Sequence, residues 1–191
     1  MAQNSEANQD LRVQRTRKQL LAALMELTIQ KGFDSVTVKD ICQHAMVNRA
    51  TFYRHYMDKY DLLDQYMDEV YDLLDQAQGE PSFDSPPAGL VRMLEHLRGH
   101  ANFYRVMLGP KGHPLFAESI RSYMEKRFRR SLPADSAPAD PGRPPIDMML
   151  RSISSAGLGA ILWWLEKDMP VTAEQMAIWA IQISKANFNL L

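Results

Sequence analysis

The sequence contains a single cysteine, Cys42, among its 191 residues. One cysteine forms no disulfide within the chain, and no Cys/His group has the spacing of a zinc site. We therefore expect a reducing compartment, the cytoplasm, and neither a metal nor another cofactor. Cys42 itself is expected to be a small core residue, with thiol sensing as the alternative.

The sequence also lacks a long hydrophobic run. The first 20 residues are polar and charged, so they have no apolar segment of the signal-peptide kind. The longest strongly apolar stretch, Ser152 to Leu165, has 14 residues, fewer than the roughly 20 that span a bilayer. We expect a buried helix there and no membrane partner. Glycines number nine, and four of the 11 prolines fall between residues 138 and 145, which leaves the rest of the chain free to be helical.

The sequence as a whole has almost no excess of one sign of charge, because its formal net charge is −1. Hydrophobic residues make up 46% and charged residues 24%, as in globular proteins. Residues 1–60 nevertheless carry nine Lys and Arg against six Asp and Glu, whereas residues 61–80 carry seven acids and no Lys or Arg. An anionic partner is therefore expected to meet the first 60 residues.

Apolar residues recur at helical spacing along the chain, and no alternating strand pattern is present. Glycine, proline and capping signals predict helices over about 11–31, 37–44, a short segment after Asn48, 58–78, 87–99, 100–108, 114–130, 146–167 and 172–189. Residues 1–10 are expected to be a frayed tail and 132–145 a mobile loop. The predicted fold is all-α with about nine helices: an N-terminal three-helix domain, residues 1–60, and a C-terminal helical bundle, residues 61–191.

A short helix, a turn of about three residues and a second short helix form a helix-turn-helix candidate. The second helix presents several donors in a row: Arg49, Thr51, Tyr53, Arg54 and His55, with Lys59 just beyond. Arg49 suits a guanine edge and Thr51 a base or a thymine methyl, whereas Tyr53, His55 and Lys59 suit phosphates. Lys59 also lies at a helix start, where free N–H groups favour an anion. The alternative is a solvated helix face that binds nothing.

These segments resemble a known family. Gly32-Phe33, residues 37–41, residues 45–56 and residues 59–62 are similar to the DNA-binding domain of TetR-type bacterial repressors, over about residues 11–62. The resemblance implies that Arg49, Ala50 and Thr51 read bases, and that Thr37, Tyr53, His55 and Lys59 contact the DNA backbone. The predicted DNA-binding set is Thr37, Lys39, Asn48, Arg49, Ala50, Thr51, Tyr53, Arg54, His55 and Lys59. Arg12 or a neighbour is a further candidate, as an arm.

Met46 departs from the family, which usually has glycine in this turn. If the turn needs a positive φ, methionine costs about 1 kcal/mol there. Further along, residues 100–104, 109–116 and 163–170 are similar to a subgroup that includes the dihydroxyacetone kinase operon regulators. Because members of such a subgroup sense different signals, the resemblance implies no particular inducer.

The C-terminal bundle has candidate effector residues. The resemblance places four methionines around a central cavity, and methionine suits adaptable ligand surfaces; these are Met67, Met93, Met107 and Met124. His96, His100 and Tyr104 are close in sequence and can supply the polar groups of a small-molecule effector site. Core filling is the alternative for the methionines. The i, i+4 spacing of the two histidines also suits a metal, although no carboxylate accompanies them.

The last two predicted helices favour self-association. Small residues allow close helix approach, and the large apolar residues near them exceed what one helix pair would hide. This combination suits an isologous four-helix dimer interface, with an intramolecular core as the alternative. The predicted interface residues are Gly157, Ala160, Trp163, Trp164, Ile178, Trp179 and Ile181.

No nucleophile-elbow, Walker, zinc-protease or Rossmann motif is present, so an enzyme is not expected. We expect a homodimeric one-component transcriptional regulator, in the first place a repressor, that binds a near-palindromic operator in double-stranded DNA. A small-molecule effector in the C-terminal domain would release it by preferring one conformation. A C-terminal domain that responds to a protein partner is the alternative.

Overall fold

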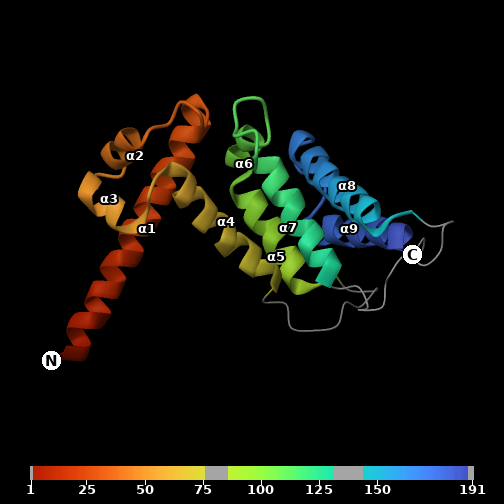
Figure 1. The fold of residues 1–191 in the computed structure, drawn as a ribbon, viewed down its shortest axis with the longest axis horizontal. Helices are drawn as coiled ribbons and strands as arrows, with labels where there is room; N and C mark the ends of the chain where they lie inside the picture. Colours follow the sequence, from red (N-terminus) through yellow and green to blue (C-terminus); the bar gives the residue numbers. More distant parts are fainter. Residues whose placement is uncertain (1, 76–85, 131–143, 189–191) are drawn as a thin grey trace.

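The computed structural model describes residues 2–75, 86–130 and 144–188. These residues form helices and no strand (Figure 1), as predicted. The helices are α1 (Ala2–Lys31), α2 (Val38–His44), α3 (Arg49–His55), α4 (Lys59–Asp75), α5 (Ala88–Gly99), α6 (Ala101–Met107), α7 (Phe116–Arg130), α8 (Ile146–Glu166) and α9 (Ala173–Phe188). Of the expected mobile loop at 132–145, residues 132–143 lie outside the described residues.

The start of α1 corrects one expectation. The helix begins at Ala2, so residues 2–10 continue it instead of fraying. No Gly or Pro interrupts Ala2–Lys31, and extending an existing helix is easier than nucleating a new one. Gly32 then ends α1 with a φ of 80°, a conformation that glycine adopts without strain.

The first three helices form a unit that we call the helix-turn-helix unit, and α4 leads from it into the bundle of α4–α9 (Figure 1). Side chains cap the N-termini of α2, α3 and α4. Thr37 and Asp40 form a capping box at α2, and Asn48 caps α3. The Asp58 carboxylate accepts the N–H groups of residues 60 and 61 at the start of α4. Because these caps satisfy free backbone donors locally, short-range sequence signals located them well.

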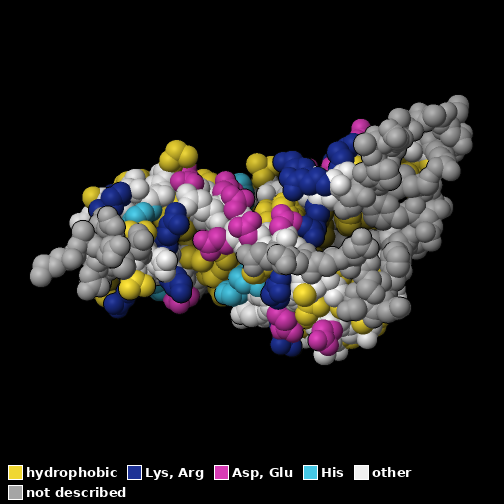
Figure 2. Space-filling model, turned by 90° about the horizontal axis from the view of Figure 1, so that it is seen from below, with side chains coloured by type: hydrophobic (Ala, Val, Ile, Leu, Met, Phe, Trp, Pro, Cys, Tyr) yellow, Lys and Arg dark blue, Asp and Glu magenta, His cyan; other side chains and the backbone are white. Residues whose placement is uncertain are grey.

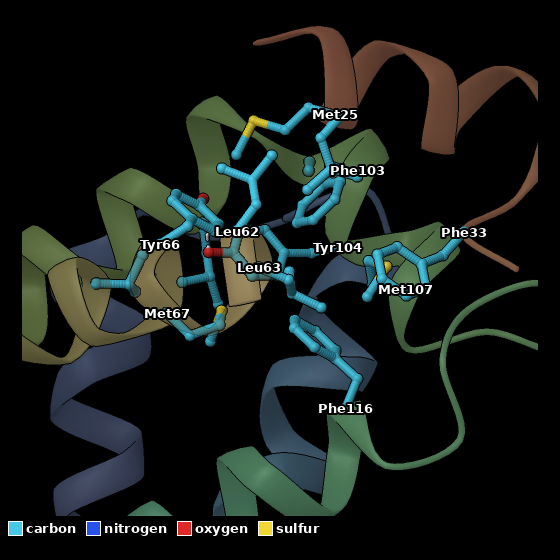
Figure 3. Packing of buried hydrophobic residues seen from close by; sticks show 14 of the residues in the cluster. Met25, Phe33, Leu62, Leu63, Tyr66, Met67, Phe103, Tyr104, Met107 and Phe116 are labelled. Carbon is cyan, nitrogen blue, oxygen red and sulfur yellow. Dashed lines mark hydrogen bonds between the residues drawn. The ribbon is translucent and has the colours of Figure 1, made fainter. Parts of the chain in front are cut away.

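One buried core runs through both parts of the molecule. Phe33, at the end of α1, belongs to the same apolar cluster as Tyr104 and Met107 of α6 (Figure 3). The helix-turn-helix unit is thus packed against the bundle as well as joined to it by α4. Contacts between α1 and α6 close this junction.

Helix α8 is long and apolar enough to span a membrane by length and composition alone, the single such helix among the described residues. Core helices of soluble proteins meet the same test. In this fold α8 packs between α7 and α9 and buries Leu150, Ile153 and Leu158. Its apolar composition is therefore explained by packing within the bundle.

Candidate nucleic-acid interface

The turn between α2 and α3 sets the direction of α3. Met46 in this turn has a φ of 53° and is 92% exposed, so the residue that replaces the family's glycine does take the left-handed conformation. The Asn48 side chain then accepts the N–H of Ala50 at 2.8 Å. Cap and turn together fix where α3 begins.

Helix α3 has two distinct faces. Phe52 is completely buried and anchors the helix, with its ring against those of Tyr53 and Tyr56. The opposite face is exposed and carries predicted DNA-binding residues: Arg49, Ala50, Tyr53 and Arg54. The Arg49 guanidinium donates to the Tyr53 hydroxyl at 3.3 Å. This contact holds both side chains along the outward face of the helix.

Helix α2 supplies two further predicted residues. The Thr37 hydroxyl donates to Asp40 Oδ2 at 2.7 Å and accepts the Asp40 N–H. The ammonium of Lys31 binds the same carboxylate at 2.8 Å. Lys31 and then Thr37 hold the pKa of Asp40 well below its usual range. Thr37 is thus engaged as a cap, whereas Lys39 is exposed.

A groove of about 1120 Å³ opens between α1 and α3. Its walls carry three cationic side chains, Arg12 and Arg15 from α1 and Arg54 from α3, beside Asn48, Thr51 and His55. Arg12, Arg15 and Arg54 form no ion pair with any carboxylate in residues 11–75, 86–130 or 144–184. Buried Nε2 of His55 has no hydrogen-bond partner there, and burial, followed by Arg54 and Arg17, lowers the pKa of this ring. The groove therefore presents cations and a His55 ring with a lowered pKa beside α3. The sequence pattern offered Arg15 only as a neighbour of Arg12, because residue spacing does not show that α1 and α3 share a groove.

Lys59 is more deeply buried than the other predicted phosphate ligands. It is only 9% exposed, and its ammonium donates to the carbonyl oxygens of Phe33 at 2.8 Å and Asp34 at 3.1 Å. Burial lowers the pKa of Lys59. Two of its three N–H groups thus donate within the chain, to partners 25 and 26 residues away that no spacing rule connects to Lys59. A phosphate contact from the third stays a prediction.

The predicted effector residues come together in part. The Tyr66 hydroxyl lies 2.7 Å from Nε2 of His96 and 3.0 Å from the Tyr104 hydroxyl. Burial, then His100, lowers the pKa of His96 to about 4, so the ring is neutral near pH 7. Met67, Met93 and Met107 are buried in the adjoining core, shown in part in Figure 3. Tyr66 was not among the predicted effector residues; the need of a buried tyrosine hydroxyl for a hydrogen-bond partner was the available signal.

The other two predicted effector residues lie apart from this network. His100 is exposed and lines a cavity of about 470 Å³ between α1 and the α5–α6 junction, with Met25, Phe103 and Met169. Met124 is half-buried on α7, and its Cε lies 3.0 Å from the position that a Cβ on Gly157 would take. The seven residues therefore do not line one site together.

The predicted dimer residues also divide. Trp164 is completely buried and its Nε1 donates to the Val171 carbonyl at 3.0 Å; it belongs to the intramolecular core, which corrects its assignment to an interface. Gly157 faces α7, and Ala160 packs against the core. Trp163 and Trp179 are 41% and 38% exposed, with ring centroids 6.4 Å apart. Ile178 and Ile181 are half-buried beside them.

Charge is unevenly distributed on the surface. Acidic side chains gather in the middle of the face shown in Figure 2, and Lys and Arg lie on both sides of them. The acids that α4 exposes are Asp64, Asp68, Glu69, Asp72 and Asp75. These charges repel DNA, so the cationic surface of the helix-turn-helix unit is the part suited to it.

Two family models match the chain. Residues 20–66 match the bacterial regulatory proteins of the tetR family, and residues 84–185 match a TetR-type transcriptional regulator C-terminal region. Two curated relatives from Bacillus subtilis (strain 168) are uncharacterized HTH-type transcriptional regulators. YvkB is 33% identical over 87 residues, 42% of this chain and 46% of that protein. YdeS is 37% identical over 60 residues, 31% and 30%. The matched part thus spans less than half of either relative.

Solved structures share the fold over most of the chain. A TetR transcriptional regulator from Streptococcus agalactiae 2603V has a TM-score of 0.63 at 23% identity, covering 94% of this chain and 98% of that one. The dihydroxyacetone kinase operon activator DhaS has a TM-score of 0.60 at 16% identity, covering 92% and 97%. NalD from Pseudomonas aeruginosa, a secondary repressor of the MexAB-OprM multidrug efflux pump, has 0.57 at 18%, covering 94% and 96%. The chain belongs to the TetR family of transcriptional regulators, with an N-terminal helix-turn-helix DNA-binding domain, and it is not an enzyme.

Proposed function

We propose that the chain is a cytoplasmic homodimeric repressor that binds a near-palindromic operator through α3 of each protomer. The observation that carries this proposal is the two-faced α3: Phe52 is buried, and Arg49 and Tyr53 point outward, hydrogen-bonded to each other. A guanidinium presented on an exposed helix can donate twice to a guanine edge in the major groove. Residues 1–60 would form the DNA-binding domain and 61–191 the effector domain, with their boundary in the first turn of α4.

The groove between α1 and α3 supports contacts to the DNA backbone. Arg12, Arg15 and Arg54 line it and have no described carboxylate partner. Phosphate contacts position a protein on the duplex without reading sequence. These arginines would therefore hold the strand that flanks the bases read by Arg49.

The outer face of α8 and α9 supports the dimer. Trp163 and Trp179 are exposed together, and Gly159, one turn before Trp163, has nothing within 4 Å of its Cβ position. Ile183 of α9 is 44% exposed as well. Large aromatic side chains beside a close-approach position suit a two-fold interface. Two recognition helices are what a palindrome requires.

The hydrogen-bonded network of Tyr66, His96 and Tyr104 supports effector control. It places two buried tyrosine hydroxyls and the half-buried His96 ring beside an apolar cluster that includes Met67 and Met93. A small molecule that replaced one of these hydrogen bonds would gain polar specificity and apolar burial together. Because α4 carries Tyr66 and also contacts α1, a shift of this helix would reach the helix-turn-helix unit. The ligand would act only by its differential affinity for the two arrangements.

The test starts from the purified full-length protein and a pool of random duplexes at low salt. We expect selection of a sequence with two related half-sites. Arg49→Ala should then weaken binding of that sequence by about tenfold or more, as expected for a lost guanine contact. Arg92→Ala is the matched control, because Arg92 is exposed on α5, away from α3.

Failure to select any sequence, or equal binding by the Arg49→Ala and wild-type proteins, would exclude α3 as the reading element. A reporter placed behind the selected operator separates repression from activation. Both activation and repression occur among the structural neighbours, since DhaS is an activator and NalD is a repressor.

A further inference from the structure

The loop that follows α1 touches the bundle backbone to backbone. The Phe33 N–H donates to the Lys111 carbonyl at 3.1 Å. A Cβ on Gly32 would lie 2.9 Å from the same carbonyl oxygen, so residue 32 is held close to the connection between α6 and α7. This contact lies outside α3 and outside the hydrogen-bonded network of the bundle.

Lys59, in the first turn of α4, binds the same loop. Its ammonium donates to the Phe33 and Asp34 carbonyls. It also lies 4.5 Å from the centroid of the Phe33 ring and 5.2 Å from that of Tyr60, within the range of cation–π attraction. The charge is therefore satisfied by carbonyl oxygens and ring faces, in a nearly buried position.

His113 completes the arrangement from the bundle side. Its ring centroid lies 5.6 Å from that of Phe33 and 5.1 Å from that of Tyr60, and the latter two are 5.5 Å apart. Three rings in mutual contact thus come from three segments: the loop after α1, the first turn of α4 and the α6–α7 connection. Lys59 faces two of these rings.

The α6–α7 connection is in turn fixed to the end of α6. A Cβ on Gly112 would lie 2.0 Å from the Met107 carbonyl oxygen, so these backbones are in close contact. Met107 is 1% exposed and lies on the same side of the core as Phe33 in Figure 3. Three residues before it, Tyr104 belongs to the buried network. A displacement of α6 therefore reaches Phe33 through a few packed groups.

We propose that Phe33, Lys59, Tyr60 and His113 form a joint that sets the orientation of the helix-turn-helix unit on the bundle, with Lys59 as its positioning residue. The inference rests on the proposed function, since orientation matters because two units must reach two half-sites at once. A helix-turn-helix unit that is free to pivot on the bundle still binds a single half-site. The dimer then loses the extra affinity that comes from binding both half-sites at once, and it no longer prefers one distance between them.

His113→Ala tests the joint from the bundle side, where no base or phosphate contact is proposed. The probes are the selected duplex, a duplex with one half-site, and duplexes with spacers lengthened or shortened by one to three base pairs. We expect single-site affinity within about twofold of the wild type, and full-site affinity reduced by about tenfold with a flattened spacer preference. Leu115→Ala, an exposed change in the same connection, should behave like the wild type.

A His113→Ala protein that keeps the wild-type spacer preference would overturn the joint, as would equal losses on single and full sites. If the wild type binds no duplex, the proposed function fails, and the joint is measured without DNA. Spin labels on Gln43→Cys and Arg92→Cys in a Cys42→Ala background, diluted with unlabelled protein, report the distance between the two parts. His113→Ala should broaden that distance distribution; an unchanged distribution would refute the joint.

Discussion

Nε2 of His96 lies 2.7 Å from the hydroxyl oxygen of Tyr66, and burial lowers the pKa of this histidine to about 4. With Nε2 as the unprotonated nitrogen, the neutral ring accepts a hydrogen bond from the Tyr66 hydroxyl, which then accepts one from the Tyr104 hydroxyl. Protonating His96 would remove the acceptor and place a charge inside the bundle. The contact is therefore stable only while the ring is neutral.

This pairing predicts a pH dependence of stability. In the unfolded chain His96 titrates near its usual value of about 6.5, so between about 6.5 and 4 the unfolded state binds more protons. The contribution of His96 is fully present above about pH 6.5 and is lost as pH falls towards 4. We expect the Tm of the wild type to fall across this window, measured by thermal unfolding at several pH values.

His96→Gln separates this effect from general acid unfolding, because glutamine accepts a hydrogen bond and does not titrate. The variant should show a shallower fall in Tm between pH 6.5 and 4 than the wild type. His100→Gln removes the neighbouring imidazole that helps to lower the pKa of His96, so its slope should lie between those of the wild type and His96→Gln. Parallel slopes for the wild type and His96→Gln would rule out His96 as the source.

Met46 predicts a stabilising substitution. Its φ of 53° costs a side-chain-bearing residue about 1 kcal/mol relative to glycine. Met46→Gly should therefore raise the free energy of unfolding by roughly that amount, less some added entropy of the unfolded chain. The corresponding rise in Tm is about 2–4 °C for a protein of this size.

The control for Met46 is Gln43→Gly, an exposed position in α2. There glycine relieves no strain and weakens the helix by about 1 kcal/mol. Two glycine substitutions three residues apart should thus change Tm in opposite directions. A lower Tm for Met46→Gly would show that the methionine side chain contributes more than its backbone strain costs.

Local features of this fold were predictable from sequence, and long-range ones were not. Thr37, Asn48 and Asp58 cap helices because each satisfies N–H groups two or three residues away, so spacing was sufficient. The Lys59 partners lie 25 and 26 residues away, and no spacing rule connects them. Trp164 looked like an interface residue because periodicity does not distinguish a face against α9 from a face against a second chain.

Lys59 predicts a loss of stability on substitution. Lys59→Met keeps the length and apolar stem but leaves the Phe33 and Asp34 carbonyls without their donor. An unsatisfied buried polar group costs about 1–3 kcal/mol, partly offset because the lysine charge no longer has to be buried. We expect the urea midpoint to fall accordingly.

Lys39→Met is the matched control for Lys59, because Lys39 is exposed on α2. Its unfolding free energy should stay within about 0.5 kcal/mol of the wild type. Equal stability of the two variants would show that the Lys59 hydrogen bonds contribute nothing net. The comparison needs no DNA and is independent of the proposed function.

The outer face of α8 and α9 predicts the effect of a charge on self-association. Gly159 is exposed with nothing within 4 Å of its Cβ position, so Gly159→Arg fits the folded protomer. In a close two-fold interface the same side chain would meet its symmetry mate and prevent approach. Disrupting a central interface position weakens the free energy of dimerisation by about 2 kcal/mol or more, which lowers the dimer affinity about thirtyfold.

Sedimentation equilibrium and thermal unfolding together would show loss of the dimer with the protomer fold retained. Leu115→Arg, equally exposed but on the α6–α7 connection, should leave the association constant unchanged. A Gly159→Arg protein that sediments as the wild-type dimer would place the interface on another surface.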